Sequence, residues 1–266
     1  MAKLQDMFTQ ARRAQSGGGI GFIGKNKSES KPHSAAIVAE FPQITAGSAE
    51  AALKAGADGL LFAWDGKDTM ALETLKQEID AARASNENAI VGLNITGSLE
   101  MLDQESLQEI KEQGIQYIIL PFDAPARLLA LEGKDLEKVV IVPRREGEIY
   151  PIYIHNLTAF DGISAVLLDF GLSDKISSMS IEEVLDYRAI REAVRFPAFL
   201  HVKGNLTQAD AFTISTLGVQ ALVLTAQDEE EDTREQIKDL RALLEKVYEE
   251  EKEKDNSSSG PGGRSR

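Results

Sequence analysis

Eight short apolar runs recur along this chain, and longer charged segments that suit helices separate them. Runs rich in Val, Ile, Leu and Phe are typical of strands buried on both faces, as parallel strands covered by helices must be. The alternation therefore predicts an α/β protein whose strands all run in one direction. We expect the strands at 35–41, 59–64, 89–95, 117–122, 139–143, 164–170, 198–203 and 221–226.

Eight such units fit a single (β/α)8 barrel, which is a closed ring of parallel strands inside a ring of helices. The chain has 266 residues, and roughly 250 residues is the usual length of such a barrel. We expect residues 1–34 to hold a leader helix and a Gly-rich linker, residues 35–254 to form the barrel, and residues 255–266 to be a flexible tail. The other helices are expected near 48–55, 69–85, 98–113, 124–131, 180–195, 207–217 and 230–253.

The segment 147–160, where the fifth helix of the barrel belongs, has poor helix propensity. It carries Pro151 and several β-branched residues. It forms either a short, distorted helix or a strand-like insert. If it is a strand, the alternative architecture is an open, doubly wound sheet.

Local signals mark the ends of several expected helices. Ser180 and Thr207 each precede an acidic residue by three positions, which is the spacing of a capping box. Ser98 is expected to start a third helix. Gly56 and Gly218 follow helices at positions where a left-handed C-cap is needed.

Two short stretches resemble known families. The stretch 46–59 resembles the helix-to-strand turns of aldolase-type TIM barrels, a group that includes flavin-binding and phosphate-binding families, and a similar turn recurs at 217–221. This resemblance implies the barrel fold. The Gly-rich string 17–24 is similar to a segment near the start of flavin-dependent nitronate monooxygenases, although the histidine in a Gly-rich turn typical of that family is missing. Because no strand precedes this string and Pro32 soon follows it, the residues themselves favour a flexible linker.

Composition narrows the classes of function. The chain has no cysteine, which excludes disulfides, thiolate metal sites and cysteine nucleophiles. Its net charge of −14 argues against nucleic-acid and anionic-membrane partners. No apolar signal segment begins the chain and no stretch approaches about 20 apolar residues, so we expect a cytoplasmic protein. We expect its partner to be a small-molecule ligand, and the sequence leaves open whether it forms a homo-oligomer.

The functional site of a (β/α)8 barrel lies at the carboxyl ends of the strands, here called the mouth. Side chains alternate along a strand, so the apolar residues that face the helices fix which residues point inward. The polar residues expected to point inward toward the mouth are Glu40, Asn94, Asp169, His201, Lys203 and Thr225.

We expect Lys203, Glu40 and Asp169 to be the catalytic residues. Lys203 would act as a Schiff-base nucleophile or as a general acid and base, tuned by the two carboxylates. Asn94, His201 and Thr225 are expected to bind the substrate. The opposing interpretation is a salt-bridge network that only neutralises polar groups, because a buried lysine needs a partner in any case. His201, one layer below Lys203, is better explained as a packed, hydrogen-bonded histidine than as a catalyst.

Further charged residues follow the strands at the same end. Asp65 and Arg144 join the expected substrate-binding residues. Arg144 and Arg145 form either a bidentate clamp for a carboxylate or phosphate, or solvated loop charges. Asp65, Asp123 and Asp228 carry the oxygen ligands that hard cations prefer. No ligand spacing supports a metal site, so none is assigned.

The loop after the eighth strand argues against the phosphate site that such barrels often carry. That site uses backbone amides after strands seven and eight. Here five consecutive acidic residues occupy 228–232, and the expected glycine is missing. The acids repel a phosphate dianion and instead offset the macrodipole of the last helix. FMN and sugar phosphates are therefore not expected at this position.

Three functions remain open at this point. The favoured one is a lyase or isomerase that acts on a polar carbonyl or carboxylate compound at the mouth. The second is a barrel without catalysis that serves as a binding or assembly module through its acidic last helix and basic tail. The third is a flavin-dependent oxidoreductase. The sequence assigns no cofactor.

Overall fold

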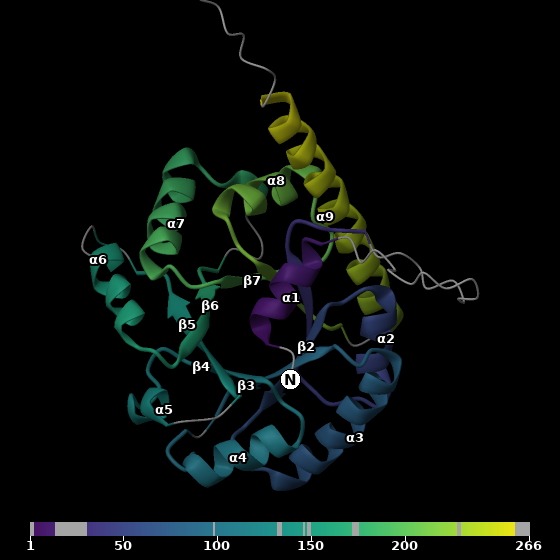
Figure 1. Cartoon of the computed structure of the whole chain (residues 1–266), viewed down its shortest axis with the longest axis vertical. Helices are drawn as coiled ribbons and strands as arrows, with labels where there is room; N and C mark the ends of the chain where they lie inside the picture. The colour runs from purple at the N-terminus through teal and green to yellow at the C-terminus, as the bar shows by residue number, and fades with distance from the viewer. Residues whose placement is uncertain are drawn as a thin grey trace, which may run out of the picture.

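Eight parallel strands form a closed barrel in the computed structural model (Figure 1). The structure describes residues 3–13, 31–97, 99–131, 135–145, 147, 150–171, 176–227 and 230–258. Each strand pairs with the next along the chain, and the last pairs with the first, so the predicted barrel is confirmed and the open sheet is wrong. The strands are β1 (Ala36–Phe41), β2 (Gly59–Trp64), β3 (Ile90–Ile95), β4 (Tyr117–Leu120), β5 (Glu137–Pro143), β6 (Ile163–Asp169), β7 (Ala198–Val202) and β8 (Ala221–Thr225).

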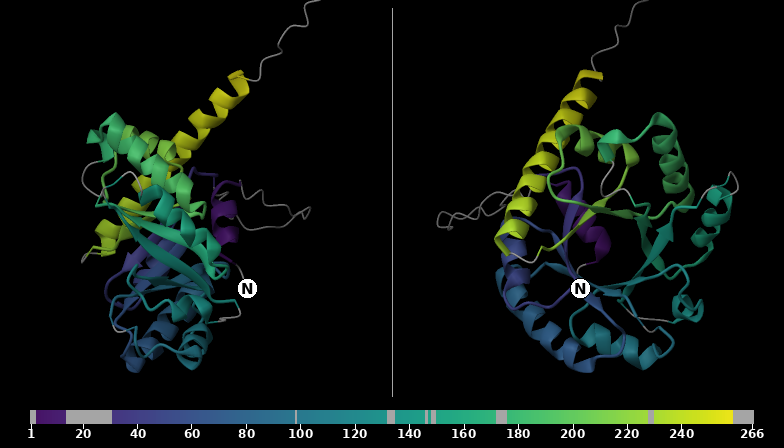
Figure 2. Two further views of the ribbon diagram at one scale, coloured as in Figure 1. Left: turned by 90° about the vertical axis from the view of Figure 1, so that its left-hand side faces the viewer. Right: turned by 180° about the vertical axis from the view of Figure 1, so that it is seen from behind.

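Helices surround the strands, and the long last helix projects beyond the barrel (Figures 1 and 2). Within the described part of the chain, no helix is both long enough and apolar enough to cross a membrane. The helices are α1 (Leu4–Ala11), α2 (Ser48–Ala55), α3 (Thr69–Ser85), α4 (Gln104–Glu112), α5 (Arg127–Ala130), α6 (Tyr150–His155), η1 (Asn156–Ala159), η3 (Ile176–Ser178), α7 (Ile181–Val194), α8 (Gln208–Leu217) and α9 (Glu230–Ser258).

The expected capping signals act at most helix ends. Ser180 and Thr207 form capping boxes at the starts of α7 and α8. Gly56 and Gly218 end α2 and α8 with φ values of 115° and 71°, in the left-handed region that glycine adopts at low cost. The predicted helix 98–113 begins later than expected, at Gln104 behind the N-cap Asp103, and Ser98 itself lies outside the described residues.

The segment 147–160 resolves as a short, distorted helix. It consists of α6 followed by the 3-10 helix η1. Pro151 lies in the first turn of α6, where its missing N–H has no intrahelical partner to lose. The hydroxyl of Tyr150 donates to the carbonyl of Pro143 at 2.6 Å and ties the helix to the end of β5.

The last helix is longer than expected. Helix α9 continues to Ser258, past the predicted barrel boundary at 254, and its side-chain contacts with α8 reach as far as Lys254. The Ser215 hydroxyl contacts the Glu251 carboxylate, and the Lys254 ammonium lies 4.1 Å from the ring centre of Phe212. The rest of the predicted tail, 259–266, and the Gly-rich string 17–24 lie outside the described residues.

Helix α1 seals the amino-terminal end of the barrel (Figure 1). Its buried side chains join the inward-facing residues of the strands in one apolar cluster. Phe8 contacts Phe199 of β7 edge to face, with ring centres 5.5 Å apart. The backbone N–H of Leu4 donates to the Glu137 carboxylate at 2.7 Å, which fixes the start of the helix. The leader helix is thus a stopper for the interior.

Replacing Phe8 by Ala should lower the free energy of unfolding by about 3–5 kcal/mol, because it opens a cavity between α1 and the strands. Gln5→Ala, on the exposed face of the same helix, should change it by less than about 0.5 kcal/mol. Urea unfolding followed by circular dichroism measures both. Equal effects of the two variants would show that α1 does not depend on its apolar face.

Candidate functional site

A buried carboxylate, Glu40, lies at the centre of the polar groups in the mouth. Glu40 is 7% exposed. Its Oε1 accepts a hydrogen bond from Asn94 Nδ2 at 3.1 Å, and its Oε2 accepts one from Thr225 Oγ1 at 2.9 Å. The Nδ1 atom of His201 lies 3.7 Å from Oε2. The structure therefore brings together these predicted inward-facing residues from β1, β3, β7 and β8.

A cavity of about 420 Å³ opens beside this cluster. His201 and Thr225 line it, and the side chain of His201 is 36% exposed, so the imidazole joins the buried carboxylate to the open space. Gln236 of α9 also lines the cavity, and its buried Oε1 has no hydrogen-bond partner within the described chain. Gly204 makes room for this amide, because a Cβ there would lie 2.4 Å from Gln236 Cδ. The sequence analysis did not predict Gln236 as a cavity residue. The only sign of it in the sequence was Gly204, which leaves room beside the end of β7 for another side chain.

Lys203 lines the same cavity but is not buried as expected. Strand β7 ends at Val202, so Lys203 follows the strand and its side chain is exposed. Asp169, the last residue of β6, is exposed as well. The contacts of Glu40 within the described residues include neither of these side chains. The expected catalytic trio is therefore not assembled around one carboxylate.

Asp65 builds its own loop after β2. Its Oδ1 accepts hydrogen bonds from the backbone N–H groups of Lys67 at 2.9 Å and Asp68 at 3.0 Å. These hydrogen bonds lower the pKa of Asp65 below its ordinary value, and the bond from the Asp68 N–H has the larger effect. Its carboxylate is thus already used as a turn former.

The two arginines after β5 have partners at the rim of the mouth. Arg144 lies 3.8 Å from the Asp186 carboxylate of α7. Arg145 lies over the ring of Phe122, 5.3 Å from its centre. Both side chains remain near the mouth, and neither contacts Glu40.

The other two histidines have structural partners that the sequence did not reveal. His33 Nε2 lies 2.8 Å from the Asp58 carboxylate, at the amino-terminal end of the barrel. His155 Nδ1 lies 2.8 Å from the carbonyl oxygen of Ala193, between α6 and α7. Among the residues that the structure describes, no three His, Asp or Glu side chains group as a metal centre requires, and Asp228 lies outside them.

Tyr117 lies deeper in the barrel than Glu40 and is fully buried. Its ring occupies the space left by Gly92, where a Cβ would lie 2.1 Å from Tyr117 Cζ. Burial, and then the negative charge of Glu40, raises the pKa of Tyr117 far above its ordinary value. The phenol stays neutral, and its hydroxyl has no hydrogen-bond partner among the described residues.

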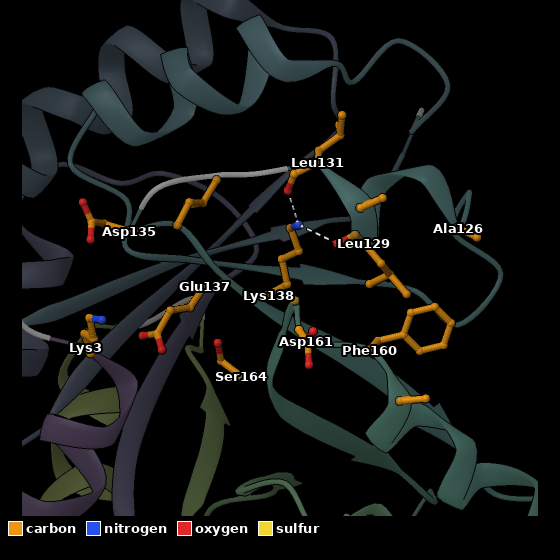
Figure 3. Close-up of a pocket in the computed structure, with 14 residues that line it drawn as sticks. Lys3, Ala126, Leu129, Leu131, Asp135, Glu137, Lys138, Phe160, Asp161 and Ser164 are labelled. Atoms are coloured by element: carbon orange, nitrogen blue, oxygen red, sulfur yellow. Dashed lines mark hydrogen bonds between the residues drawn. The ribbon is translucent and has the colours of Figure 1, made fainter.

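Another cavity, of about 650 Å³, lies at the opposite end of the barrel, near the starts of β5 and β6 (Figure 3). Its most buried charge is Lys138, whose ammonium donates to the carbonyls of Leu129 at 3.1 Å and Leu131 at 2.5 Å. Burial lowers the pKa of Lys138. Because the amine terminates the short helix α5, we interpret it as a structural group at the stability face of the barrel.

No protein-family model matches the sequence, and no curated protein matches it. Solved structures do share its fold. Tryptophan synthase from M. tuberculosis superposes with a TM-score of 0.60 at 13% identity, covering 92% of this chain and 100% of that chain. Native KDPGal gives 0.54 at 16% identity, with 80% and 94% covered. The YdjI aldolase from Escherichia coli K12 gives 0.51 at 13% identity, with 80% and 90% covered.

The chain has the fold of the aldolase-type TIM barrels. This confirms the fold that the turns at 46–59 and 217–221 implied. At such low identity the likeness extends to the fold alone, because one barrel carries many unrelated sites. The function therefore depends on the side chains of the mouth itself.

Tyr117→Phe should raise the free energy of unfolding by about 1 kcal/mol, because it removes a buried hydroxyl without a partner. Tyr150→Phe is the matched control and should lower it by about 1 kcal/mol, because it removes the hydrogen bond to Pro143. Chemical denaturation of the two variants measures the difference. A loss of stability in Tyr117→Phe would mean that its hydroxyl is paired in solution.

Proposed function

We propose that this protein is a lyase or isomerase that moves a proton on a small carbonyl or carboxylate compound held at the mouth. One observation carries the proposal. A histidine lines an open cavity on one side and meets a buried, hydrogen-bonded carboxylate on the other. Histidine is the side chain best suited to proton transfer near neutral pH.

In this proposal His201 carries the proton and Glu40 orients it. Nδ1 faces Glu40, so with the proton on Nδ1 the lone pair of Nε2 is available to the ligand. Asn94 and Thr225 hold the carboxylate in place and leave it little freedom to rotate. Because Glu40 is buried, its carboxylate attracts an imidazolium that forms during the reaction more strongly than an exposed carboxylate would.

Lys203 and Gln236 bind the polar end of the substrate in this arrangement. Lys203 supplies a positive charge at the edge of the cavity, which suits a carboxylate or a polarised carbonyl oxygen. The unpartnered atom of Gln236 is its amide oxygen Oε1, an acceptor, so in this proposal it faces a hydroxyl or amino group of the substrate rather than its carboxylate. Asp169, Asp65 and Arg144 remain predicted contacts at the rim for a larger substrate.

The proposed class of reaction is known on this fold. Solved structures with the same fold include a protein named as an aldolase and a tryptophan synthase. The flavin alternative rests on the Gly-rich string, which lies outside the described residues and stays a prediction.

Incubation with 2-oxo acids such as pyruvate in D2O should exchange the protons next to the carbonyl, which proton NMR detects as loss of signal. His201→Asn should slow this exchange at least about 100-fold, because it removes the proton carrier. Glu40→Gln should slow it less, since the imidazole remains. Asp123→Asn, at an exposed position after β4, is the control and should keep the native rate.

The proposal fails if His201→Asn exchanges the protons as fast as the native protein. It also fails if the native protein accelerates exchange in no compound of a panel of 2-oxo acids, hydroxy acids and aldehydes.

A further inference from the structure

A second cavity lies at the same end of the molecule but outside the ring of strands. Its volume is about 210 Å³, and α2 and α9 enclose it against the ends of β1 and β8. One wall is apolar, formed by Phe41 of β1, Ala52 of α2 and Ala226 after β8. Phe41 and Ala52 are 3% and 1% exposed, so this wall is firmly packed.

The opposite wall carries one positive and one negative side chain from the first turns of α9. Arg234 lines the cavity, and its buried Nε–H has no hydrogen-bond partner within the described residues. The rest of its guanidinium lies 3.3 Å from Glu231. Glu230 lines the cavity one turn earlier on the same helix. Although Nε is covered by protein atoms, the Arg234 side chain as a whole is 37% exposed, so the outer part of its guanidinium is accessible to a ligand carboxylate.

We propose that this cavity binds a small zwitterion of the α-amino acid class with an apolar side chain. The ligand carboxylate accepts from Arg234, its ammonium faces Glu230, and its side chain packs on Phe41 and Ala52. Guanidinium groups bind carboxylates with directional, charge-assisted hydrogen bonds. The volume of 210 Å³ equals the share of about seven water molecules at about 30 Å³ each, which suits a ligand of this size.

Charge excludes the other small ligands that fit by size. A phosphate or a dicarboxylate would meet Glu230 and Glu231 without enough positive charge to balance it. A diamine would meet the guanidinium of Arg234. A ligand with one charge of each sign pairs with both charged side chains, and its apolar side chain covers the apolar wall.

The site is independent of the proposed proton transfer at the mouth. Gln227 lines both cavities, but none of the groups proposed to act on the substrate belongs to the second one. A variant at His201 should therefore leave amino-acid binding intact.

The test is titration of the full chain with L-leucine, followed by calorimetry and by saturation-transfer NMR. We expect saturable binding at millimolar concentrations. Isovaleric acid, which lacks the ammonium, and isoamylamine, which lacks the carboxylate, should each bind at least tenfold more weakly. This comparison uses only the native protein and does not depend on how any variant folds.

Substitutions then locate the site. Arg234→Met should weaken L-leucine binding at least tenfold, and Ala51→Leu, which fills the cavity, should abolish it. Lys238→Met, one turn further along α9 at an exposed position outside the lining, is the matched control and should bind normally, as should His201→Asn.

Two results would overturn the inference. One is the absence of L-leucine binding to the native protein. The other is binding that neither Arg234→Met nor the removal of either ligand charge weakens, which would place the amino acid elsewhere.

Discussion

The pairing of β1 with β8 is the contact on which the mouth depends. This pairing closes the barrel and runs from Ala36 opposite Ala221 to Glu40 opposite Thr225. The last pair in this register is also the hydrogen bond that holds the buried carboxylate. A shift by one residue would turn Glu40 toward the helices and an apolar side chain toward the mouth. The same strand register thus closes the barrel and positions the carboxylate of Glu40.

The interior of the barrel changes from apolar to polar along its axis. At the lower end α1 fills the space with Met7 and Phe8, and above it Phe199 and Tyr117 pack with ring centres 5.8 Å apart. A charge placed among these rings would be costly without partners. Glu40 is tolerated because it lies above them, where two hydrogen bonds and an imidazole surround it. The apolar stopper therefore restricts charged chemistry to the upper end.

Strand periodicity was enough to predict which polar side chains meet inside the mouth. Glu40, Asn94 and Thr225 lie within strands, where alternation decides which side chains point inward. The same reasoning misjudged the burial of Lys203, because β7 ends one residue before it and alternation no longer holds beyond a strand end. The turns at Gly56 and Gly218 were equally readable, since a left-handed backbone conformation is a local requirement.

Contacts between distant segments were not predictable in this way. Gln236 and Arg234 reach the upper end only because α9 packs against α2 and α8, and helical period does not encode that packing. The direction of α1 was hidden for the same reason. The sequence predicted a leader helix but not the open end of the barrel as the surface that receives it.

The acidic start of α9 links these observations. Glu230 and Glu231 lie in the first turn, where carboxylates offset the helix macrodipole, so they stabilise the helix whatever the site binds. They also set the charge of the second cavity, where Arg234 faces an acid on the same helix. The mouth cavity instead has Lys203 and His201 on its lining and a carboxylate already engaged by donors. The two cavities, which share Gln227, should therefore bind ligands of different charge. The mouth should bind an anionic or carbonyl compound, and the second cavity should bind a ligand with one charge of each sign.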